Sequence, residues 1–186
     1  MGDFFSMKNI RIIDKNFEIL YNSEDIQKKL SDIAKAINKD YKDKETPLFL
    51  CMLSGAYIFA ADLLRQIKIP CEISFIKWSS YSGTESTGII KEQMLPTIDV
   101  KGRDVIIIED IVDTGVTIYN LSNKLKQLGA KSSRIATLLT KPSKLKVSIK
   151  LDYVGFEIAD RFVIGYGMDY NEYGRNLNAI YQLTEI

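Results

Sequence analysis

Residues 105–120 read VIIIEDIVDTGVTIYN, and this segment carries the strongest structural signal in the chain. Apolar β-forming residues run directly into the acidic side chains of Glu109, Asp110 and Asp113, and the small or hydroxylated residues 114–117 then begin a helical pattern. A helix that starts in this way presents unpaired backbone N–H groups, for which phosphate is the usual ligand. Neighbouring carboxylates repel phosphate, but they accept hydrogen bonds from sugar hydroxyls or hold hydrated Mg²⁺. The segment therefore predicts a site for a phosphorylated ribose.

Strand and helix patterns alternate on both sides of this segment. Residues 23–39 predict an amphipathic helix, the apolar run PLFLCML ends at Ser54 and Gly55, and RIATLLT ends just before Lys141. Strands that are apolar throughout and alternate with helices predict an α/β fold with a central, mostly parallel sheet flanked by helices. Ligands bind beyond the carboxyl ends of the strands in such a sheet. We therefore expect the residues after all three strands to face one crevice.

The composition excludes several classes of function. A chain of 186 residues is expected to form one domain, and 46% hydrophobic with 26% charged residues is typical of a globular protein. The 25 basic and 24 acidic residues give a net charge of +1, so nucleic acid is not an expected partner. The chain contains no histidine, which excludes Ser-His-Asp and Cys-His nucleophiles and His-ligated zinc. Catalysis must use carboxylates, Lys, Tyr or Arg.

The two cysteines and the absence of long apolar runs indicate the compartment. Cys51 and Cys71 each lie within an apolar run, which suits buried reduced thiols rather than a disulfide. No run approaches the roughly 18 apolar residues of a membrane span, and the first ten residues lack the order of a signal peptide. We expect a soluble, cytoplasmic protein with no membrane partner.

Several segments together are similar to one protein family. The segment IIIEDIVDTGVT resembles the 5-phosphoribosyl-1-pyrophosphate (PRPP) signature of type I phosphoribosyltransferases. The hypoxanthine-guanine branch of that family has segments similar, in order and spacing, to LSGAYIFAADLLRQI, SSYSGTESTG, LLTKPSK and VGFEIADRFVIGYGMDYNEYGRNL. The last of these, residues 154–177, is the most specific, and the similarity spans about residues 10–183. The resemblance implies the type I phosphoribosyltransferase fold, with a small hood subdomain over the crevice.

The resemblance assigns the ribose phosphate to residues 109–117. Glu109 and Asp110 would hold the ribose hydroxyls, directly or through Mg²⁺, and the 5′-phosphate would bind Thr114, Gly115, Val116 and Thr117. Asp113 would act near N7 of the purine as a general base, or stabilise the proton there. Capping of the following helix is a simpler role for Asp113 and is compatible with the first. Val116 replaces a basic residue often found in the family, which leaves phosphate binding to backbone N–H groups and hydroxyls.

The purine would bind after the next strand and in the C-terminal segment. Lys141 favours 6-oxopurines, because an ammonium group can only donate and therefore suits O6 rather than the amino group of adenine. Without the resemblance, it would be interpreted as a solvated lysine in a turn. The resemblance implies that Phe162 stacks on the base, that the Val163 backbone reads its edge, and that Asp169 lies beside the metal and the purine. Taken alone, Phe162 is more typical of a core.

The pyrophosphate would bind two further segments. The resemblance implies that Ser54 and Gly55 belong to a pyrophosphate loop over residues 53–56, and that Arg175 binds the same group. Ser54 replaces a lysine that is common in the family, so the positive charge there falls to Arg175 and Mg²⁺. Family members often have a non-proline cis peptide bond in this loop, and the sequence leaves its isomer open. A surface ion pair is the alternative for Asp169 and Arg175.

Residues 79–96 resemble a mobile lid, with Ser80 and Tyr81 as its closing pair. A lid would exclude water from a transition state that resembles a ribosyl oxocarbenium ion. A surface loop is the alternative interpretation. We expect one phosphoribosyltransferase domain over residues 1–186, divided into a core at about residues 40–140 and a hood from about residues 1–22 and 141–186.

These observations predict a purine salvage transferase. It would transfer phosphoribose from PRPP to N9 of hypoxanthine or guanine, with Mg²⁺ as the metal, and release IMP or GMP and pyrophosphate. Family members are dimers or tetramers, so a homodimer or homotetramer is expected. One alternative is an enzyme that also accepts xanthine. Another is a non-catalytic, PRPP-sensing regulator that binds nucleic acid, which the net charge of +1 disfavours.

Overall fold

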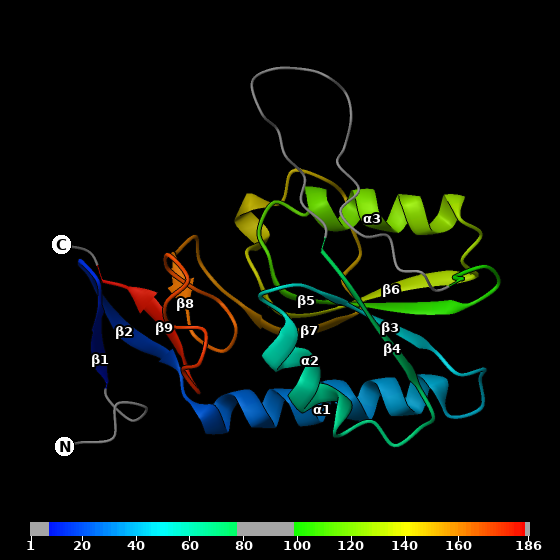
Figure 1. The fold of residues 1–186 in the computed structure, drawn as a ribbon, viewed down its shortest axis with the longest axis horizontal. Coiled ribbons are helices and arrows are strands. Elements are labelled where there is room, and N and C mark those ends of the chain that lie inside the picture. Colours follow the sequence, from blue (N-terminus) through cyan, green and yellow to red (C-terminus); the bar gives the residue numbers. More distant parts are fainter. Residues whose placement is uncertain (1–7, 78–98, 185–186) are drawn as a thin grey trace.

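A five-stranded parallel sheet forms the centre of the molecule (Figure 1). The computed structural model describes residues 8–77 and 99–184. The sheet has the order β4-β3-β5-β6-β7, and each of these pairings is parallel. Its strands are β3 (Leu48–Met52), β4 (Glu72–Ile76), β5 (Asp104–Val112), β6 (Ser132–Thr140) and β7 (Tyr153–Glu157). The predicted α/β fold with a central parallel sheet is confirmed.

Helices cover both faces of this sheet. Helices α1 (Ser23–Tyr41) and α2 (Tyr57–Leu64) lie on one face, and α3 (Val116–Gln127) lies on the other (Figure 1). Helix α1 begins after Asn22, whose side chain forms a reciprocal capping box with Asp25. Its buried side chains recur at helical spacing and join the main hydrophobic core: Ile26, Leu30, Ile33, Ala34, Ile37 and Tyr41. The amphipathic pattern of the sequence therefore packs α1 against the sheet.

Strand β5 extends further than its apolar pattern predicts. It is buried from Asp104 through Ile108 and then continues to Val112, so Glu109 and Asp110 lie within the strand. The extension forms because β5 pairs with β6 in parallel as far as the pair Val112 and Thr140. The two acidic residues are thus held by strand hydrogen bonds rather than by a free loop.

A second, antiparallel sheet joins the two ends of the described chain. It has the order β1-β2-β9-β8 and comprises β1 (Asn9–Ile12), β2 (Lys15–Tyr21), β8 (Val163–Ile164) and β9 (Ile180–Leu183). A separate small core holds it together, formed by Ile10, Phe17, Ile164, Leu177, Ala179 and Tyr181. We call residues 8–21 and 160–184 the hood, which lies at one end of the central sheet (Figure 1). The central sheet itself extends beyond the predicted boundary near residue 140, because β7 pairs with β6.

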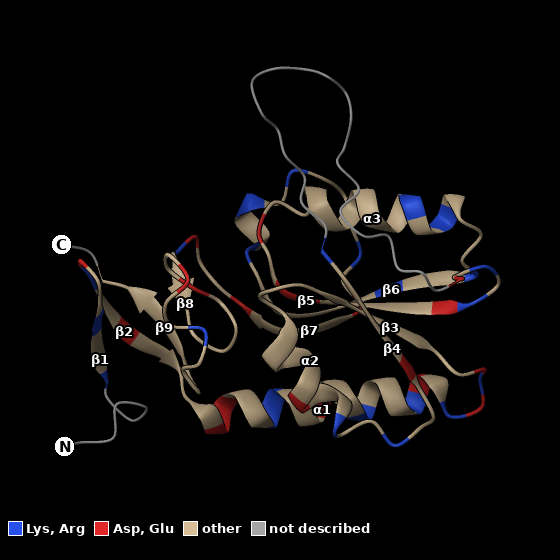
Figure 2. Cartoon of the chain, viewed as in Figure 1, with Lys and Arg blue, Asp and Glu red and all other residues tan. Residues whose placement is uncertain are grey.

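Charge and cysteine placement complete the description. Basic and acidic residues are intermixed over the helices and both sheets (Figure 2). No helix in the described ranges is long and apolar enough to cross a membrane. Both cysteines are free: Cys51 is buried, and Cys71 is only half-buried because it precedes the edge strand β4. The predicted lid, with Ser80 and Tyr81, lies outside the described residues.

Candidate active site

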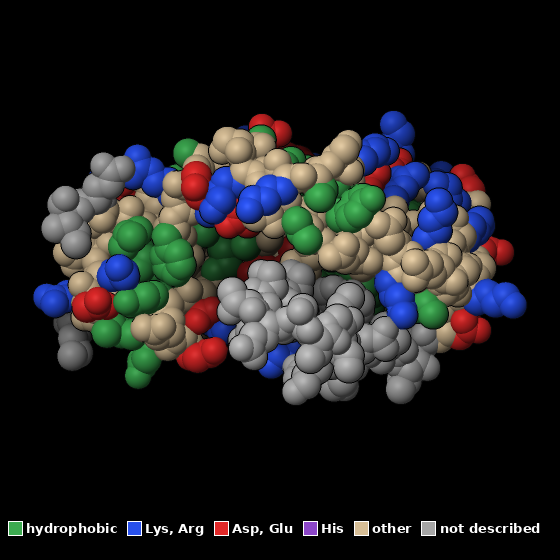
Figure 3. All heavy atoms as spheres, turned by 90° about the horizontal axis from the view of Figure 1, so that it is seen from above, with side chains coloured by type: hydrophobic (Ala, Val, Ile, Leu, Met, Phe, Trp, Pro, Cys, Tyr) green, Lys and Arg blue, Asp and Glu red, His purple; other side chains and the backbone are tan. Residues whose placement is uncertain are grey.

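A cavity of about 260 Å³ opens where β5 leads into α3. The carboxyl ends of β3 and β5 meet there, and the lining comes from the segments that follow them: Met52, Leu53, Gly55, Glu109, Ile111, Val112, Asp113, Thr114, Gly115, Thr117 and Ile118. Figure 3 shows this side of the molecule hollowed next to the hood. The cavity thus brings Glu109, Thr114, Gly115 and Thr117 of the predicted ribose-phosphate site together with Gly55 of the predicted pyrophosphate loop. The other predicted residues of these two groups are not among its lining residues: Asp110, Val116, Ser54 and Arg175.

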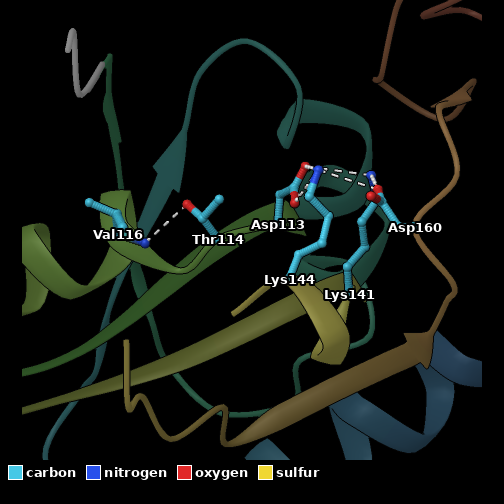
Figure 4. A network of polar contacts seen from close by, with 6 residues as sticks. All are labelled: Asp113, Thr114, Val116, Lys141, Lys144 and Asp160. Atoms are coloured by element: carbon cyan, nitrogen blue, oxygen red, sulfur yellow. Dashed lines mark hydrogen bonds and ion pairs between the residues drawn. The ribbon is translucent and has the colours of Figure 1, made fainter. Parts of the chain in front are cut away.

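The start of α3 provides backbone donors to this cavity. Gly115 is the N-cap residue and has a φ of 76°, in the left-handed region that glycine adopts most readily. Gly115 has no side chain to cap α3, and the hydrogen bonds of Asp113 go to Lys141 and Lys144 rather than to the start of this helix. The backbone N–H of Val116 lies 3.5 Å from Oγ1 of Thr114 (Figure 4). The first turn of α3 therefore directs backbone N–H groups toward the cavity, where they can bind a phosphate.

Glu109 and Asp110 form an acidic pair beside this loop. Burial, together with the neighbouring charge of Asp110, raises the pKa of Glu109 well above its usual value. A Cβ atom added to Gly55 would overlap the carboxylate of Asp110, so the loop after β3 lies directly against the pair. Burial raises the pKa of the underlying Cys51 thiol to about 12, with further contributions from both acids. A bound cation would reduce the electrostatic repulsion between the two carboxylates.

The acidic pair is better suited to a hydrated divalent cation than to a cation coordinated only by protein side chains. Mg²⁺ keeps several waters and is usually held by one or two carboxylates together with substrate phosphates. No cluster of three candidate metal ligands occurs among residues 8–77 and 99–184. The third predicted metal ligand, Asp169, pairs with Arg175 in the hood.

Asp113 belongs to a network of four charged side chains (Figure 4). Lys141, whose side chain is 7% exposed, places Nζ 3.5 Å from Oδ2 of Asp113 and 3.2 Å from Oδ1 of Asp160. Lys144 approaches the same two carboxylates at 3.2 and 3.3 Å. The hydrogen bond to Asp113 raises the pKa of Lys144, and hydrogen bonds from both lysines outweigh burial and lower the pKa of Asp160. The two positive and two negative charges balance.

An aromatic surface of the hood carries Phe162, whose ring is 46% exposed. Tyr170 packs edge-on against this ring, with centroids 6.0 Å apart, and Phe17 lies 6.4 Å away. The Tyr170 hydroxyl donates a hydrogen bond to Asp14 at 2.9 Å. Val163 follows in β8 and is buried. The supported, partly exposed ring of Phe162 is suited to stacking on a flat ligand.

The hood also contacts the loop after β3. A Cβ atom added to Gly167 would overlap the carbonyl oxygen of Gly55. Arg175 donates through Nη1 to the carbonyl oxygen of Gly167 at 2.9 Å and pairs through Nη2 with Asp169 at 2.7 Å. The Leu53–Ser54 peptide bond is cis. Gly167 therefore links the two segments that were predicted to bind pyrophosphate.

Two members of the charged network, Lys144 and Asp160, were not predicted from the sequence. The spacing of the two lysines in KPSK could have indicated Lys144, which follows Lys141 by three residues. The structure forms the 3₁₀ helix η2 (Pro142–Lys144) there. Residues three apart in such a turn lie on the same side. Asp160 stands two residues before Phe162 in the C-terminal segment, and its proximity to Asp113 is a tertiary contact with no local signal.

The sequence and this geometry match a known class of enzyme. Residues 16–171 match the family described as the phosphoribosyl transferase domain. This match covers most of the chain, which therefore belongs to the phosphoribosyl transferase family. The predicted transferase class is confirmed, and enzymes of this class generally need a divalent metal ion.

Its relatives define the branch more narrowly. The chain is 44% identical over 161 residues to the hypoxanthine-guanine phosphoribosyltransferase of Bacillus subtilis, covering 86% of this chain and 89% of that protein. It is 38% identical over 180 residues to the hypoxanthine-guanine-xanthine phosphoribosyltransferase of Tritrichomonas foetus, covering 96% and 98%. A hypoxanthine phosphoribosyltransferase structure from Staphylococcus aureus superposes with a TM-score of 0.84 at 38% identity, covering 90% of this chain and 91% of that one. The predicted fold and the predicted resemblance are confirmed.

Proposed function

We propose that this chain transfers the phosphoribosyl group of PRPP to N9 of hypoxanthine or guanine and so acts in purine salvage. The observation that carries the proposal is the buried ammonium of Lys141. It lies beside Asp113, which lines the cavity at the junction of β5 and α3. A buried group that can only donate selects a base with an oxygen acceptor at position 6. The names of the relatives support the same substrates.

PRPP would bind along the β5–α3 segment. The 5′-phosphate would accept hydrogen bonds from the backbone of residues 114–117 and from the Thr114 and Thr117 hydroxyls. Glu109 and Asp110 would accept hydrogen bonds from the ribose hydroxyls and hold Mg²⁺ through one or both carboxylates. When bound, Mg²⁺ would supply positive charge next to the pyrophosphate leaving group. Ser54, Gly55 and Arg175 would orient that group from the opposite side.

The purine would bind between Phe162 and the charged network. Phe162 would stack on the base, the Val163 backbone would contact its edge, and Lys141 would donate to O6. In the transfer step, N9 forms a bond to C1′ of the ribose while the bond from C1′ to the pyrophosphate oxygen breaks, and pyrophosphate keeps the electron pair. Asp113 would accept the proton that the purine gives up, or stabilise it at N7. The products are IMP or GMP and pyrophosphate.

Xanthine is a second candidate substrate. The observation that favours it is the relative from Tritrichomonas foetus, whose name includes xanthine and which aligns with 96% of this chain. Xanthine carries the same O6 acceptor, so Lys141 does not distinguish it from hypoxanthine or guanine.

We further infer that the protein acts in the cytoplasm as a homodimer or homotetramer. The free cysteines support a reducing compartment. Analytical ultracentrifugation of the full chain would measure the oligomeric state, and a monomer at micromolar concentration would contradict this expectation.

The test is the initial rate of nucleotide formation from PRPP and Mg²⁺ with hypoxanthine, guanine, xanthine or adenine supplied separately. We expect turnover of hypoxanthine and guanine but not of adenine. Turnover of adenine alone would contradict the role of Lys141. Saturable PRPP binding without turnover of any base would contradict the enzyme and favour a PRPP-sensing regulator.

A further inference from the structure

Lys144 approaches the same two carboxylates as Lys141, although the proposed reaction needs only Lys141. Its Nζ lies 3.2 Å from Oδ1 of Asp113 and 3.3 Å from Oδ1 of Asp160 (Figure 4). The 3₁₀ helix η2 explains why both lysines reach the same carboxylates, because its i to i+3 spacing places Lys144 directly above Lys141. The backbone N–H of Lys144 donates to the carbonyl oxygen of Lys141 at 3.0 Å. The main chain therefore directs both ammonium groups toward Asp113 and Asp160.

The turn that carries Lys144 is also fixed to the phosphate loop. The backbone N–H of Lys146 donates to the carbonyl oxygen of Thr114 at 3.0 Å. A Cβ atom added to Gly115 would meet the side chains of Leu145 and Val147 at 3.2 and 3.1 Å. These contacts fix the position of Lys144 relative to the loop that begins at Asp113.

Lys141 has competing partners for its N–H groups. Both carboxylates of the network lie within 3.5 Å of its Nζ, and a purine O6 atom would require one of its three donors. A carboxylate that loses its counter-charge in a partly buried site is destabilised, which would oppose binding of the base. Lys144 supplies a second counter-charge to both carboxylates, so Lys141 can turn toward the base without leaving either of them unpaired.

We propose that Lys144 is a positioning residue for purine binding: it holds Asp113 and Asp160 so that Lys141 is free to donate to O6 of the base. The inference rests on the proposed function, because it assumes a 6-oxopurine substrate. Lys144 acts through its neighbours and is not a catalytic residue. If Lys144 only contributed to stability, its replacement would lower the free energy of unfolding without selectively weakening purine binding.

The test compares three variants of the full-length protein, Lys144→Gln, Lys144→Arg and Lys146→Gln. With PRPP saturating, we expect Lys144→Gln to raise the KM for hypoxanthine about tenfold, the usual effect of weakening one hydrogen bond to a charged group. The KM for PRPP should stay close to that of the wild type. Lys144→Arg should restore most of the purine affinity, because it keeps the charge and the donors. Lys146→Gln removes an exposed charge from the same segment and should leave both constants unchanged.

A binding measurement separates this effect from turnover. Calorimetric titration should show about tenfold weaker binding of GMP to Lys144→Gln and unchanged binding of ribose 5-phosphate, which lacks the base. An unchanged KM for hypoxanthine in Lys144→Gln would overturn the inference, and so would an equal loss of affinity for both titrants. Failure of the wild type to use any 6-oxopurine would instead overturn the proposed function.

Discussion

Asp113 is the residue on which the proposed chemistry depends most. The sequence offered two roles for it, a helix cap and a base near N7, and its hydrogen bonds in the structure go to Lys141 and Lys144 rather than to α3. Its carboxylate instead pairs with the ammonium groups of both Lys141 and Lys144 and lines the cavity at the junction of β5 and α3. A carboxylate in this position can accept a proton or a hydrogen bond from a base bound next to Lys141.

Replacement of Asp113 by Asn should abolish most turnover while PRPP still binds. The amide keeps the shape of the side chain but cannot accept a proton, so we expect kcat to fall by about 10²-fold or more. Steady-state rates and a PRPP binding titration would measure the two effects. Asp160→Asn is the matched control, because it removes the same charge from the same network, and its kcat should fall less. Unchanged turnover in Asp113→Asn, or equal losses in both variants, would contradict the role of Asp113.

At the level of single elements, the sequence pattern predicted the helices and strands that depend on residues close together in the chain. The apolar runs of β3, β5 and β6 and the periodicity of α1 place these elements correctly. The extension of β5 to Val112 and the place of β7 in the central sheet depend on pairing with β6, which the sequence does not display. The contact between Lys144 and Asp160 likewise joins segments brought together only by the fold. The local patterns therefore identify Asp113 and Lys141, whereas their contacts with Lys144 and Asp160 depend on the fold.

The contact between the hood and the loop after β3 predicts an effect of Gly167→Ala. The new Cβ would overlap the carbonyl oxygen of Gly55, and the φ of 104° is unfavourable for alanine. Displacement of the pyrophosphate loop by part of an ångström should lower kcat/KM for PRPP about 10–100-fold. Gly102→Ala is the control, since its φ of 74° is also left-handed but no atom lies within 4 Å of the new Cβ. Gly102→Ala should lower the free energy of unfolding by about 1 kcal/mol without changing kcat/KM. Similar values of kcat/KM in both variants would contradict the role of the contact.

A buried hydroxyl connects α1 to the edge strand β7 and predicts a pH-dependent effect of Tyr153→Phe. The Tyr153 hydroxyl donates to Asp40 at 2.8 Å and accepts from Arg134 at 2.7 Å. Its loss should lower the free energy of unfolding at pH 7 by about 1 kcal/mol, measured by urea denaturation. Tyr119→Phe, at an exposed position of α3, should have no such effect.

The sign of the pH dependence follows from Asp40. The hydrogen bond from Tyr153, together with the hydrogen bond and charge of Arg134, lowers the pKa of Asp40 below its usual value of 3.8. The unfolded chain then binds the proton more tightly, so this stabilisation is present at neutral pH and is lost as the pH falls below about 4. The difference between wild type and Tyr153→Phe should therefore be smaller at about pH 3 than at pH 7. A difference that grows on acidification would contradict this account.

At the scale of the whole molecule, the described residues form two hydrophobic cores of unequal size. The main core packs the central sheet against its helices, and the small core holds the hood sheet. Phe17 belongs to the small core and also lies beside the rings of Phe162 and Tyr170. The surface proposed to stack on the purine is thus part of the less extensively buried sheet. Regions with fewer buried apolar contacts open at lower free energy.

Phe17→Ala should therefore destabilise the hood selectively. Truncation of a buried Phe typically costs about 3–5 kcal/mol, and here the loss should fall on the hood amides. Hydrogen exchange followed by mass spectrometry should show reduced protection in β2 and β9, with β3 and β5 little changed. The KM for hypoxanthine should rise more than the KM for PRPP, because the supported ring of Phe162 is lost while the β5–α3 loop is retained. An equal loss of protection in both sheets would show instead that they unfold as one cooperative unit.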